Sequence, residues 1–585
     1  MRYKYMIAAA EILLLAVLVL ALLQKVIREP SVRFSEEEAF QEEAFELSLE
    51  GGLFGGAIYY TLDGSDPTLD SPVYEKPIPI EAGLPDRVTV VKAAMLTGGQ
   101  LGEIRTRTYF VGEGASSLFD TMVVSLSADP KVLYDEETGI LSNFQERGED
   151  GEWDRPAYIE FYEADGRKML AQGTGIAVSG NASRAFDQKS IKLISGREYD
   201  PDHETFDYDF FDADMGGNKT GQSYNRLVLR NGGNDHNGTM IRWNVVSRLA
   251  REAGMICAGA RPGVLFLNGE YYGIIQLQEK YTRYNIAHAL RAREQDVEKF
   301  QQEESYSSRF GGYYSRLHED LNDPERQEKL ETSVDMEDML RYYAMNIMMN
   351  NLDWPYNNYL SFRCAKNSVS AYGDERVRFL LYDLDTVWQD LNKEEIYLAF
   401  DYLMEEPPED VADAFSLLMR SDKYRTQFVN LICDLTSTVY TEEQILKTIE
   451  EENAKIAHSM ELYAPAERRS AQQAALEELK SVAASSGAQM RLGLIKHLGA
   501  ERPYTMKLEV PEGMTVSFSQ IQIKEPGVYT GVYYHNYPLT LSATPGEGQE
   551  FYGWLVNGEE IREPELLLDD RYTADELEIK LITSL

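Results

Sequence analysis

Two short motifs near the middle of the chain contain the residues whose types and spacing best suit catalysis. The first begins at Asp353 and places the amide of Asn358 five residues after the carboxylate, in a turn-forming sequence that follows an apolar helical pattern. The second ends an apolar strand pattern with Asp383 and Asp385. Phosphoryl transfer uses such a set, because one carboxylate orients the acceptor hydroxyl while an Asn and a further Asp hold metal against nucleotide phosphates. Taken singly, Asp353 also suits a helix end or a turn, and the Asp383–Asp385 pair also suits a calcium site or a turn.

A glycine-rich stretch and a basic strand pattern precede these motifs. Residues 173–180 include Gly175 and predict a loop whose backbone N–H groups can approach phosphates, although an ordinary hairpin is the alternative. The next strand pattern carries Lys189 and Lys192. Because side chains alternate along a strand, the two lysines point to opposite faces, and the sequence leaves open which of them faces a cleft. Either one alone also fits a solvated surface lysine.

A helix pattern at about 239–252 and two strand patterns come next. The strands, 263–267 and 272–277, are joined by Asn268-Gly269, a strong hairpin signal. The second strand runs on to Glu279, where either the backbone meets an adenine ring or the carboxylate pairs with the cleft lysine. Three charged residues near the helix start fit a site or a structural salt-bridge network about equally: Arg230, Asp235 and Arg242.

Further elements must position the two acidic motifs. A helix over about 339–348, whose Met and aromatic stripe indicates core, delivers Asp353. Strands over 359–362 and 376–381 predict a hairpin that presents the two aspartates. The elements occur in the order glycine loop, lysine strand, helix, hairpin and acidic motifs. A chance combination explains this order less well than a kinase-like site does.

Together these residues resemble the CotH family, the spore-coat protein H type of atypical protein kinase. The resemblance covers about residues 120–460 and depends on these positions: Gly175, Arg184, Lys189, Arg230, Arg242, Glu279, Asp353, Asn358, Asp383 and Asp385. It implies phosphorylation of Ser or Thr on secreted, coat or envelope proteins, with ATP and Mg²⁺ or Mn²⁺ as cofactors.

The resemblance also implies a role for each residue. Asp353 would orient and deprotonate the acceptor hydroxyl. Asn358 and Asp383 would hold the metal, with Asp385 as the alternative ligand. Lys189 or Lys192 would bind phosphates, and the remaining nucleotide-site residues would be Gly175, Arg184 and Glu279.

The expected fold class is a multidomain α+β protein with a two-lobed, atypical kinase-like domain flanked by small β-rich modules. That domain spans about 118–500, and residues 30–44 read as an acidic spacer. Residues 45–113 predict a β-sandwich that resembles the C-terminal domain of chitobiase and β-hexosaminidases, on the string from Ile58 to Thr68. Residues 503–585 predict a small β-rich, repeat-like domain. For the N-terminal module a spacer role is favoured over glycan contact, whereas the C-terminal module is expected to be structural or adhesive.

The overall composition limits which classes of partner and which location we expect for the protein. The chain has 585 residues, 97 acidic and 57 basic, for a net charge of −40, which disfavours nucleic acid and anionic lipid as partners. Its three cysteines show no disulfide framework or zinc spacing. Residues 6–23 are apolar enough for a single transmembrane helix within an anchor at 1–29, so we expect a membrane protein whose bulk is extracytoplasmic.

Two other functions remain open on the sequence. The same ATP site could transfer AMP or glutamate, because a modest change in nucleotide pose exposes a different phosphorus. Alternatively, the chain is a non-enzymatic surface adhesin or scaffold with a kinase-like fold. The joint presence of Asp353, Asn358 and Asp383 favours an enzyme.

Overall fold

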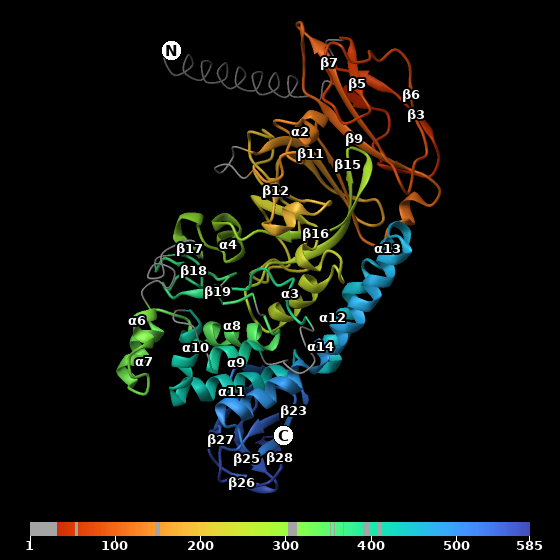
Figure 1. Ribbon diagram of the computed structural model, residues 1–585. Coiled ribbons are helices and arrows are strands. Elements are labelled where there is room, and N and C mark those ends of the chain that lie inside the picture. The colour runs from red at the N-terminus through yellow and green to blue at the C-terminus, as the bar shows by residue number, and fades with distance from the viewer. Residues whose placement is uncertain are drawn as a thin grey trace, which may run out of the picture.

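The protein is a multidomain, mixed α/β molecule with a β-rich N-terminal region (Figure 1). The computed structural model describes residues 32–52, 56–146, 153–301, 313–351, 353–355, 357–366, 368–389, 398–405 and 411–584. The predicted transmembrane segment at 6–23 lies outside these residues. Within the described ranges, none of the helices combines the length and apolar character needed to cross a bilayer.

The N-terminal module is built from short strands around its own apolar core. One sheet has the order β2-β9-β7-β5, with β8 paired to β7, while β1 pairs with β4 and β3 with β6. The strand bounds are β1 (Val32–Phe34), β2 (Phe40–Gln41), β3 (Phe45–Leu47), β4 (Leu49–Gly51), β5 (Ile58–Thr61), β6 (Ile78–Ile80), β7 (Thr89–Thr97), β8 (Gln100–Leu101) and β9 (Arg105–Val111).

The acidic segment expected as a spacer is part of this module, at least over its described residues 32–44. Val32 is fully buried, and its strand β1 pairs with β4. Phe40 of β2 pairs with Phe110 of β9. The spacer interpretation is therefore wrong for these residues. The Glu-rich composition concealed an alternation in which Val32 and Phe34 face the core while Arg33 faces solvent.

A closed seven-stranded barrel follows the N-terminal module. The order around it is β10-β11-β12-β13-β14-β16-β15, and the parallel pairing of β10 with β15 closes it. Inward residues such as Ile191 and Leu193 form its core. The bounds are β10 (Met122–Ser127), β11 (Arg155–Tyr162), β12 (Lys168–Ser179), β13 (Ser190–Ile194), β14 (Arg226–Arg230), β15 (Ala260–Leu267) and β16 (Glu270–Glu279).

The hairpin predicted at Asn268-Gly269 is confirmed. It joins β15 to β16, and its two central residues have φ of 49° and 85°, the left-handed conformation that such a tight turn requires. The expected helix near 239–252 is also present, as α3 (Arg242–Glu252). Shorter helices in this half are α2 (Pro130–Tyr134), η1 (Ala115–Ser117), η2 (Ala182–Ala185) and η3 (Gly233–Asp235).

A helical lobe with a small sheet lies next to the barrel (Figure 1). The sheet has the order β17-β18-β19 and includes the hairpin predicted around residue 360. Its strands are β17 (Val297–Gln301), β18 (Leu360–Cys364) and β19 (Arg378–Leu380). The helices are α4 (Arg283–Ala289), η4 (Glu294–Asp296), α6 (Tyr314–Leu317), α7 (Pro324–Glu331), α8 (Met336–Met348), α9 (Leu398–Glu405), α10 (Val411–Met419), α11 (Asp422–Ser437), α12 (Glu442–Ala454), α13 (Ala457–Tyr463) and α14 (Ala466–Leu498).

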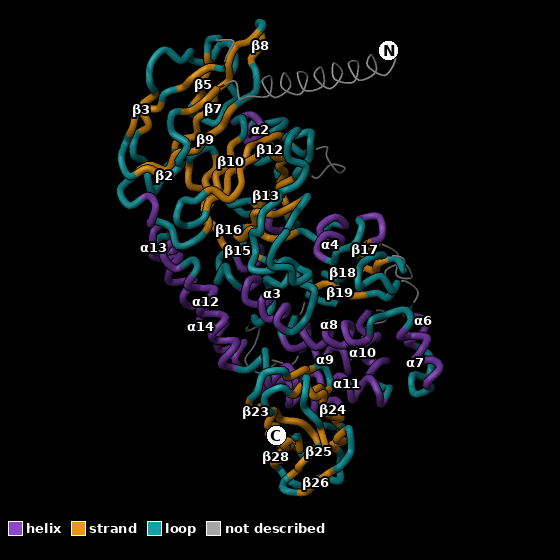
Figure 2. Tube along the Cα trace, turned by 180° about the vertical axis from the view of Figure 1, so that it is seen from behind, coloured by secondary structure: helices purple, strands orange, loops and turns teal. Residues whose placement is uncertain are grey.

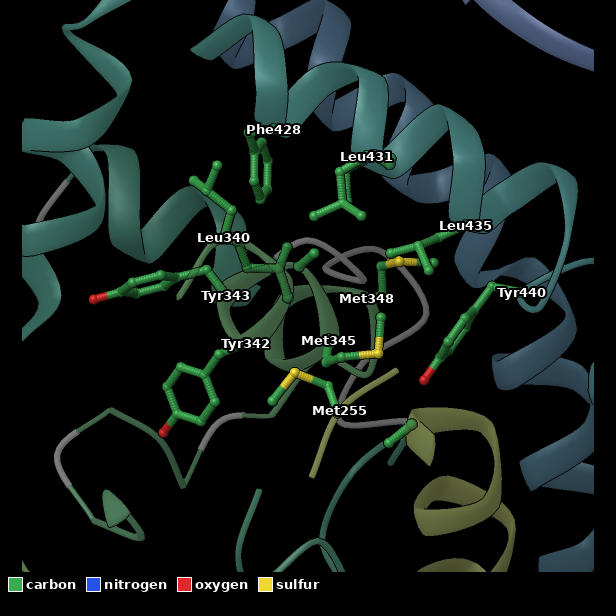
Figure 3. Close-up of a cluster of buried hydrophobic side chains, with 14 of the residues drawn as sticks. Met255, Leu340, Tyr342, Tyr343, Met345, Met348, Phe428, Leu431, Leu435 and Tyr440 are labelled. Carbon is green, nitrogen blue, oxygen red and sulfur yellow. The ribbon is translucent and has the colours of Figure 1, made fainter. Parts of the chain in front are cut away.

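Helix α8 forms the centre of the lobe, as its Met and aromatic stripe predicted. Figure 3 shows Leu340 and Met348 of α8 facing Phe428 and Leu431 of α11. Asp335 caps the N-terminus of α8 by accepting from the Asp338 N–H. Thr441 likewise caps the N-terminus of α12 by accepting from the Gln444 N–H.

The C-terminal module is a pair of sheets that docks on the helical lobe (Figure 2). The sheets have the orders β23-β20-β28-β25-β26 and β22-β21-β24-β27. One buried apolar cluster includes residues of both this module and the helical lobe. The bounds are β20 (Pro503–Val510), β21 (Met514–Phe518), β22 (Ile521–Ile523), β23 (Gly527–Tyr534), β24 (Leu539–Pro545), β25 (Phe551–Val556), β26 (Glu559–Ile561), β27 (Glu565–Leu568) and β28 (Glu576–Thr583).

Candidate active site

The loop after α8 carries Asp353 and is anchored by the residue that follows it. Trp354 is buried, its indole N–H donates to the Tyr342 hydroxyl at 2.7 Å, and the two rings pack edge to face. Asp353 itself is only partly buried. Its carboxylate accepts from Asn357 Nδ2 at 2.9 Å and from Asn358 Nδ2 at 2.8 Å. The loop therefore holds a carboxylate and its amides in one fixed group.

The second motif follows β19 and brings two carboxylates onto one guanidinium. Arg230 Nη2, at the end of β14, lies 2.6 Å from Asp383 Oδ1 and 2.7 Å from Asp385 Oδ2. Burial raises the pKa of Asp383, and the negative charges of Asp385 and Asp353 add to that increase while Arg230 opposes it. Asp353 therefore lies near enough to Asp383 for its charge to act on that carboxyl.

The loop after Arg230 completes this cluster through Gly233 and Asn234, which the sequence alone did not single out. It follows β14, and the Asn234 N–H donates to Asp385 Oδ2 at 2.8 Å. Gly233 has a φ of 58°, and a Cβ there would lie 1.8 Å from Asp385 Oδ2 and 2.6 Å from Arg230 Nη2. Only glycine lets the backbone approach so closely. The signal available in the sequence was the pair Gly232-Gly233 directly after Asn231.

The charged residues near α3 divide between the site and its support. Asp235 is buried and accepts from the Thr239 and Arg242 N–H groups, while Arg242 donates to the carbonyls of Val387 and Trp388. Asp235 and Arg242 thus fix α3 to the segment after the second motif. Arg230 belongs to the site itself.

The expected glycine-rich phosphate loop does not form. Gly175 lies within β12, where it pairs with Pro156 on one side and Ile194 on the other. A Cβ at Gly175 would lie 2.4 Å from the Tyr199 ring, so glycine is needed here for packing. The alternative interpretation, an ordinary hairpin, was closer to the observed structure, because Gly175 lies in a strand. A glycine run between two strand patterns also fits a strand that is tightly packed against its neighbours.

Arg184 and Lys189 lie together beside Phe144 rather than in a predicted phosphate loop. The Arg184 guanidinium donates to the backbone carbonyls of Phe144, Glu146, Val178 and Gly180. The Lys189 ammonium donates to the Phe186 carbonyl and sits 4.1 Å from the centre of the Phe144 ring. These contacts show both cations binding protein groups in this structure.

Lys192 and Glu279 lie on opposite sides of the barrel wall. Lys192 alternates with the inward Ile191 and Leu193, so it faces outward, and its ammonium lies 3.2 Å from Asp154 Oδ1. Glu279 Oε2 instead accepts from the Gly259 N–H, and burial raises the Glu279 pKa to about 8. The structure therefore pairs Lys192 with Asp154. Of the two alternatives left open for Glu279, the one in which it pairs with a cleft lysine is wrong.

A comparison with protein families identifies the central domain. The model of the CotH kinase protein family matches residues 176–485, which is more than half of the chain. The chain belongs to the CotH kinase protein family. A second family model, described as Fn3 associated, matches residues 47–109, the region of the N-terminal module.

The other comparisons are less informative. A search of curated proteins gave no match to this CotH-family chain. Among solved structures, the twitchin kinase region from C. elegans aligns over 88% of this chain and 96% of that chain, with 9% identity and a TM-score of 0.16. That likeness is too low to support an argument about the fold.

The acidic cluster of this CotH-family chain fits a divalent cation. Asp385 is buried, and its Oδ1 has no hydrogen-bond partner among the described residues, whereas its Oδ2 is bound twice. A buried carboxylate oxygen without a partner is costly unless a cation or a donor satisfies it. Carboxylate oxygens are also the ligands that Mg²⁺ prefers. Asp383, Asp385 and the amide oxygen of Asn358 are the residues suited to hold such an ion.

Proposed function

We propose that this protein is an ATP-dependent protein kinase that transfers the γ-phosphate to Ser or Thr of other proteins. The observation that carries the proposal is the convergence of Asp353, with its Asn358 amide, and the Arg230–Asp383–Asp385 cluster at one site between the barrel and the helical lobe. Protein kinases use a carboxylate for the acceptor hydroxyl and a separate set of groups for metal and phosphates. Membership of the CotH family supports the same reaction class.

Each side chain has a distinct role in this proposal. Asp353 accepts the proton of the acceptor hydroxyl, and the amides of Asn357 and Asn358 hold its carboxylate in place. Asp383, Asp385 and Asn358 bind Mg²⁺ or Mn²⁺, which when present neutralises charge on the phosphates. Arg230 and Lys192, both on the outer wall of the barrel, orient the phosphate chain.

The location and partners form a second part of the proposal. The apolar segment 6–23 anchors the protein in the cell membrane, and the bulk of the chain is extracytoplasmic, where it phosphorylates secreted, coat or envelope proteins. The β modules space the kinase domain from the membrane or contact glycans. A net charge of −40 argues against nucleic acid as a partner.

A transfer assay with matched variants tests the catalytic proposal. Full-length protein in detergent is incubated with ATP labelled at the γ-phosphate, Mg²⁺ or Mn²⁺, and a generic Ser/Thr acceptor. We expect Asp353→Asn to lower the transfer rate by about 10²–10⁴-fold, the usual loss on removing a catalytic base. Asp383→Asn should abolish ATP- and metal-dependent thermal stabilisation as well. Asp320→Asn, an exposed carboxyl on a distant turn, is the control and should behave as the wild type.

Other outcomes of this assay lead to different functions. Retention of label from the α-phosphate instead of the γ-phosphate would indicate AMP transfer, and a mass increase of one glutamate on the acceptor would indicate glutamylation. No transfer of any label, together with no ATP-dependent stabilisation, would favour the adhesin or scaffold function and contradict the proposal.

A further inference from the structure

Three neighbouring strands present cations in register on the outer wall of the barrel. The register aligns Lys192 of β13 with Val228 of β14 and Gln278 of β16. Because side chains alternate, Arg226 and Arg230 lie on the same face of β14 as Val228. Lys280, directly after β16, continues the face of Gln278. The same face therefore carries positive charge from Arg230, next to the acidic cluster, to Arg226 and Lys280.

The cations at the far end of this face lack carboxylate partners. Neither Arg226 nor Lys280 forms an ion pair with any residue that the structure describes, although both are half-buried. Lys299 of β17 is close by, and its ammonium donates to the Tyr281 carbonyl at 3.0 Å. In a chain with 97 acidic and 57 basic residues, two neighbouring half-buried cations, Arg226 and Lys280, without an ion-pair partner among the described residues are unexpected unless an anionic ligand binds there.

Lys280 lies within reach of several other positive charges. Burial lowers its pKa to about 8, and the positive charges of Lys192, Lys299, Arg226 and Arg230 all contribute in the same direction. Lys280 therefore lies in the combined field of four neighbouring cations. An anion bound between them would remove this repulsion.

The position of this group relative to the acidic cluster limits what it can bind. Arg226 and Arg230 are four residues apart on one strand, roughly 13 Å. The group lies where β16 leads into the helical lobe, the place that a kinase hinge gives to the adenine ring. Apolar walls suit a flat heterocycle, whereas clustered Arg and Lys side chains suit phosphate oxygens.

We propose that Arg226, Lys280 and Lys299 form a phosphate-binding subsite at the hinge end of the cleft, separate from the Arg230–Asp383–Asp385 cluster. The inference rests on the proposed kinase function and deepens it. It states that a phosphate group of the nucleotide is the ligand of these three residues. It also predicts that a polyphosphate chain without a base binds here.

Chemical footprinting tests the subsite without relying on phosphate transfer. Full-length protein is treated near the pKa of Lys280 with an amine-acylating reagent, and modification of each lysine is measured by mass spectrometry. We expect ATP and inorganic tripolyphosphate to protect Lys280, and adenosine to leave its modification unchanged. Lys131, an exposed lysine on α2, is the internal control and should be modified equally in all conditions. Protection by adenosine, or no protection by either phosphate ligand, would overturn the inference.

Substitutions provide the second test. Lys280→Gln and Arg226→Gln should each weaken ATP and tripolyphosphate binding by about tenfold or more, the value of one charge-assisted hydrogen bond, as measured by calorimetry. Lys280→Arg should retain binding, and Lys131→Gln is the matched control. Thermal unfolding of each variant separates a folding defect from a binding defect.

The two proposals fail in different ways. If γ-phosphate transfer occurs but Lys280→Gln binds ATP as tightly as the wild type, the subsite is wrong and the kinase function stands. If tripolyphosphate protects Lys280 while no transfer is found, the subsite stands and the kinase function is wrong.

Discussion

At the scale of single residues, the site depends on how closely Arg230, Asp383 and Asp385 are held by backbone from elsewhere in the chain. The Asn234 N–H reaches Asp385 because Gly233 adopts a positive φ with no side chain in the way. The Asp383–Asp385 pair was evident in the sequence. Its partner loop was not, because Asn234 and Asp385 are 151 positions apart and no local pattern joins them.

We predict that Gly233→Ala lowers transfer activity strongly. The new Cβ would lie 1.8 Å from Asp385 Oδ2, so the carboxylate or the loop must move, and a displacement of about 1 Å at a catalytic group costs on the order of 10²-fold in rate. Steady-state kinetics checks this. Gly217→Ala is a matched control, since Gly217 also has a positive φ, of 84°, but has no atom within 4 Å of the added Cβ. Equal losses in the two variants would show that backbone strain, not contact with Asp385, is responsible.

At the scale of elements, α8 and the strands around it fix the geometry of the catalytic loop. Trp354 hydrogen-bonds to Tyr342 of α8, and the carboxyl of Asp338, also on α8, accepts from the Phe379 N–H of β19 at 2.7 Å. One helix therefore positions both acidic motifs. Its apolar and aromatic pattern predicted a core helix, but not the two polar anchors that it supplies.

We predict that Tyr342→Phe destabilises the protein by about 1–3 kcal/mol, because the buried Trp354 N–H then loses its acceptor. Chemical denaturation measures this change, and the turnover rate should fall with it as the Asp353 loop loosens. Tyr440→Phe removes a hydroxyl that is also buried but has no hydrogen-bond partner among the described residues, so this control should be close to neutral. A neutral Tyr342→Phe would mean that ring packing alone holds the loop.

At the scale of the whole molecule, the modules are joined by shared packing. The apolar cluster of the helical lobe continues into the C-terminal module, and the buried Asp434 of α11 accepts from the Tyr533 hydroxyl of β23 at 2.7 Å. At the other end, Tyr463 of α13 stacks on Tyr271 of the barrel and donates to the Pro85 carbonyl of the N-terminal module. Helices α12, α13 and α14 run along one side between the two ends (Figure 1).

We predict that the C-terminal module and the helical lobe unfold together. Leu508→Ala in β20 removes a fully buried side chain from the shared cluster and should cost about 2–5 kcal/mol. In calorimetry, Leu508→Ala should lower the midpoint temperature of the unfolding transition that ATP and metal shift upward. Leu47→Ala, equally buried but within the separate N-terminal core, is the matched control and should leave that transition in place. The same shift in both variants would indicate a single cooperative unit.

We also predict that the protein becomes less stable as pH rises through about 7 to 8. Burial raises the pKa of Asp338 and of Asp434 to about 7, and that of Glu279 to about 8, whereas the same groups ionise near pH 4 in an unfolded chain. Between these values the folded state holds protons that the unfolded state releases, so stability is greatest at the acidic end, falls across this interval and levels off once the folded groups have ionised.

Thermal unfolding at several pH values between about 5 and 9 checks the sign of this dependence. Glu279→Gln should flatten the upper part of the curve, because the amide cannot ionise but can still accept from the Gly259 N–H. Glu270→Gln, an exposed neighbour on the same strand, should leave the curve unchanged. A stability that increases with pH across this range would contradict the prediction.

The sequence by itself determined the chemistry-bearing motifs and the local elements that carry them. Asp353, Asp383 and Asp385 stand out because their types and spacing are visible in short segments, and Asn268-Gly269 specifies its hairpin by local backbone preference. The apolar period of α8 likewise depends on only a few turns of chain. The order of these elements was enough to indicate the CotH resemblance.

Only the tertiary structure decided which side chains meet. Gly175, Arg184 and Lys189 matched a phosphate loop in type and order, yet strand pairing and carbonyl contacts occupy them. Glu279 turned away from Lys192 because the closure of the barrel sets which face of β16 is inside. The roles of Arg230, Gly233 and Lys280 depend on residues far along the chain. Such contacts depend on the packing of the whole fold rather than on local spacing.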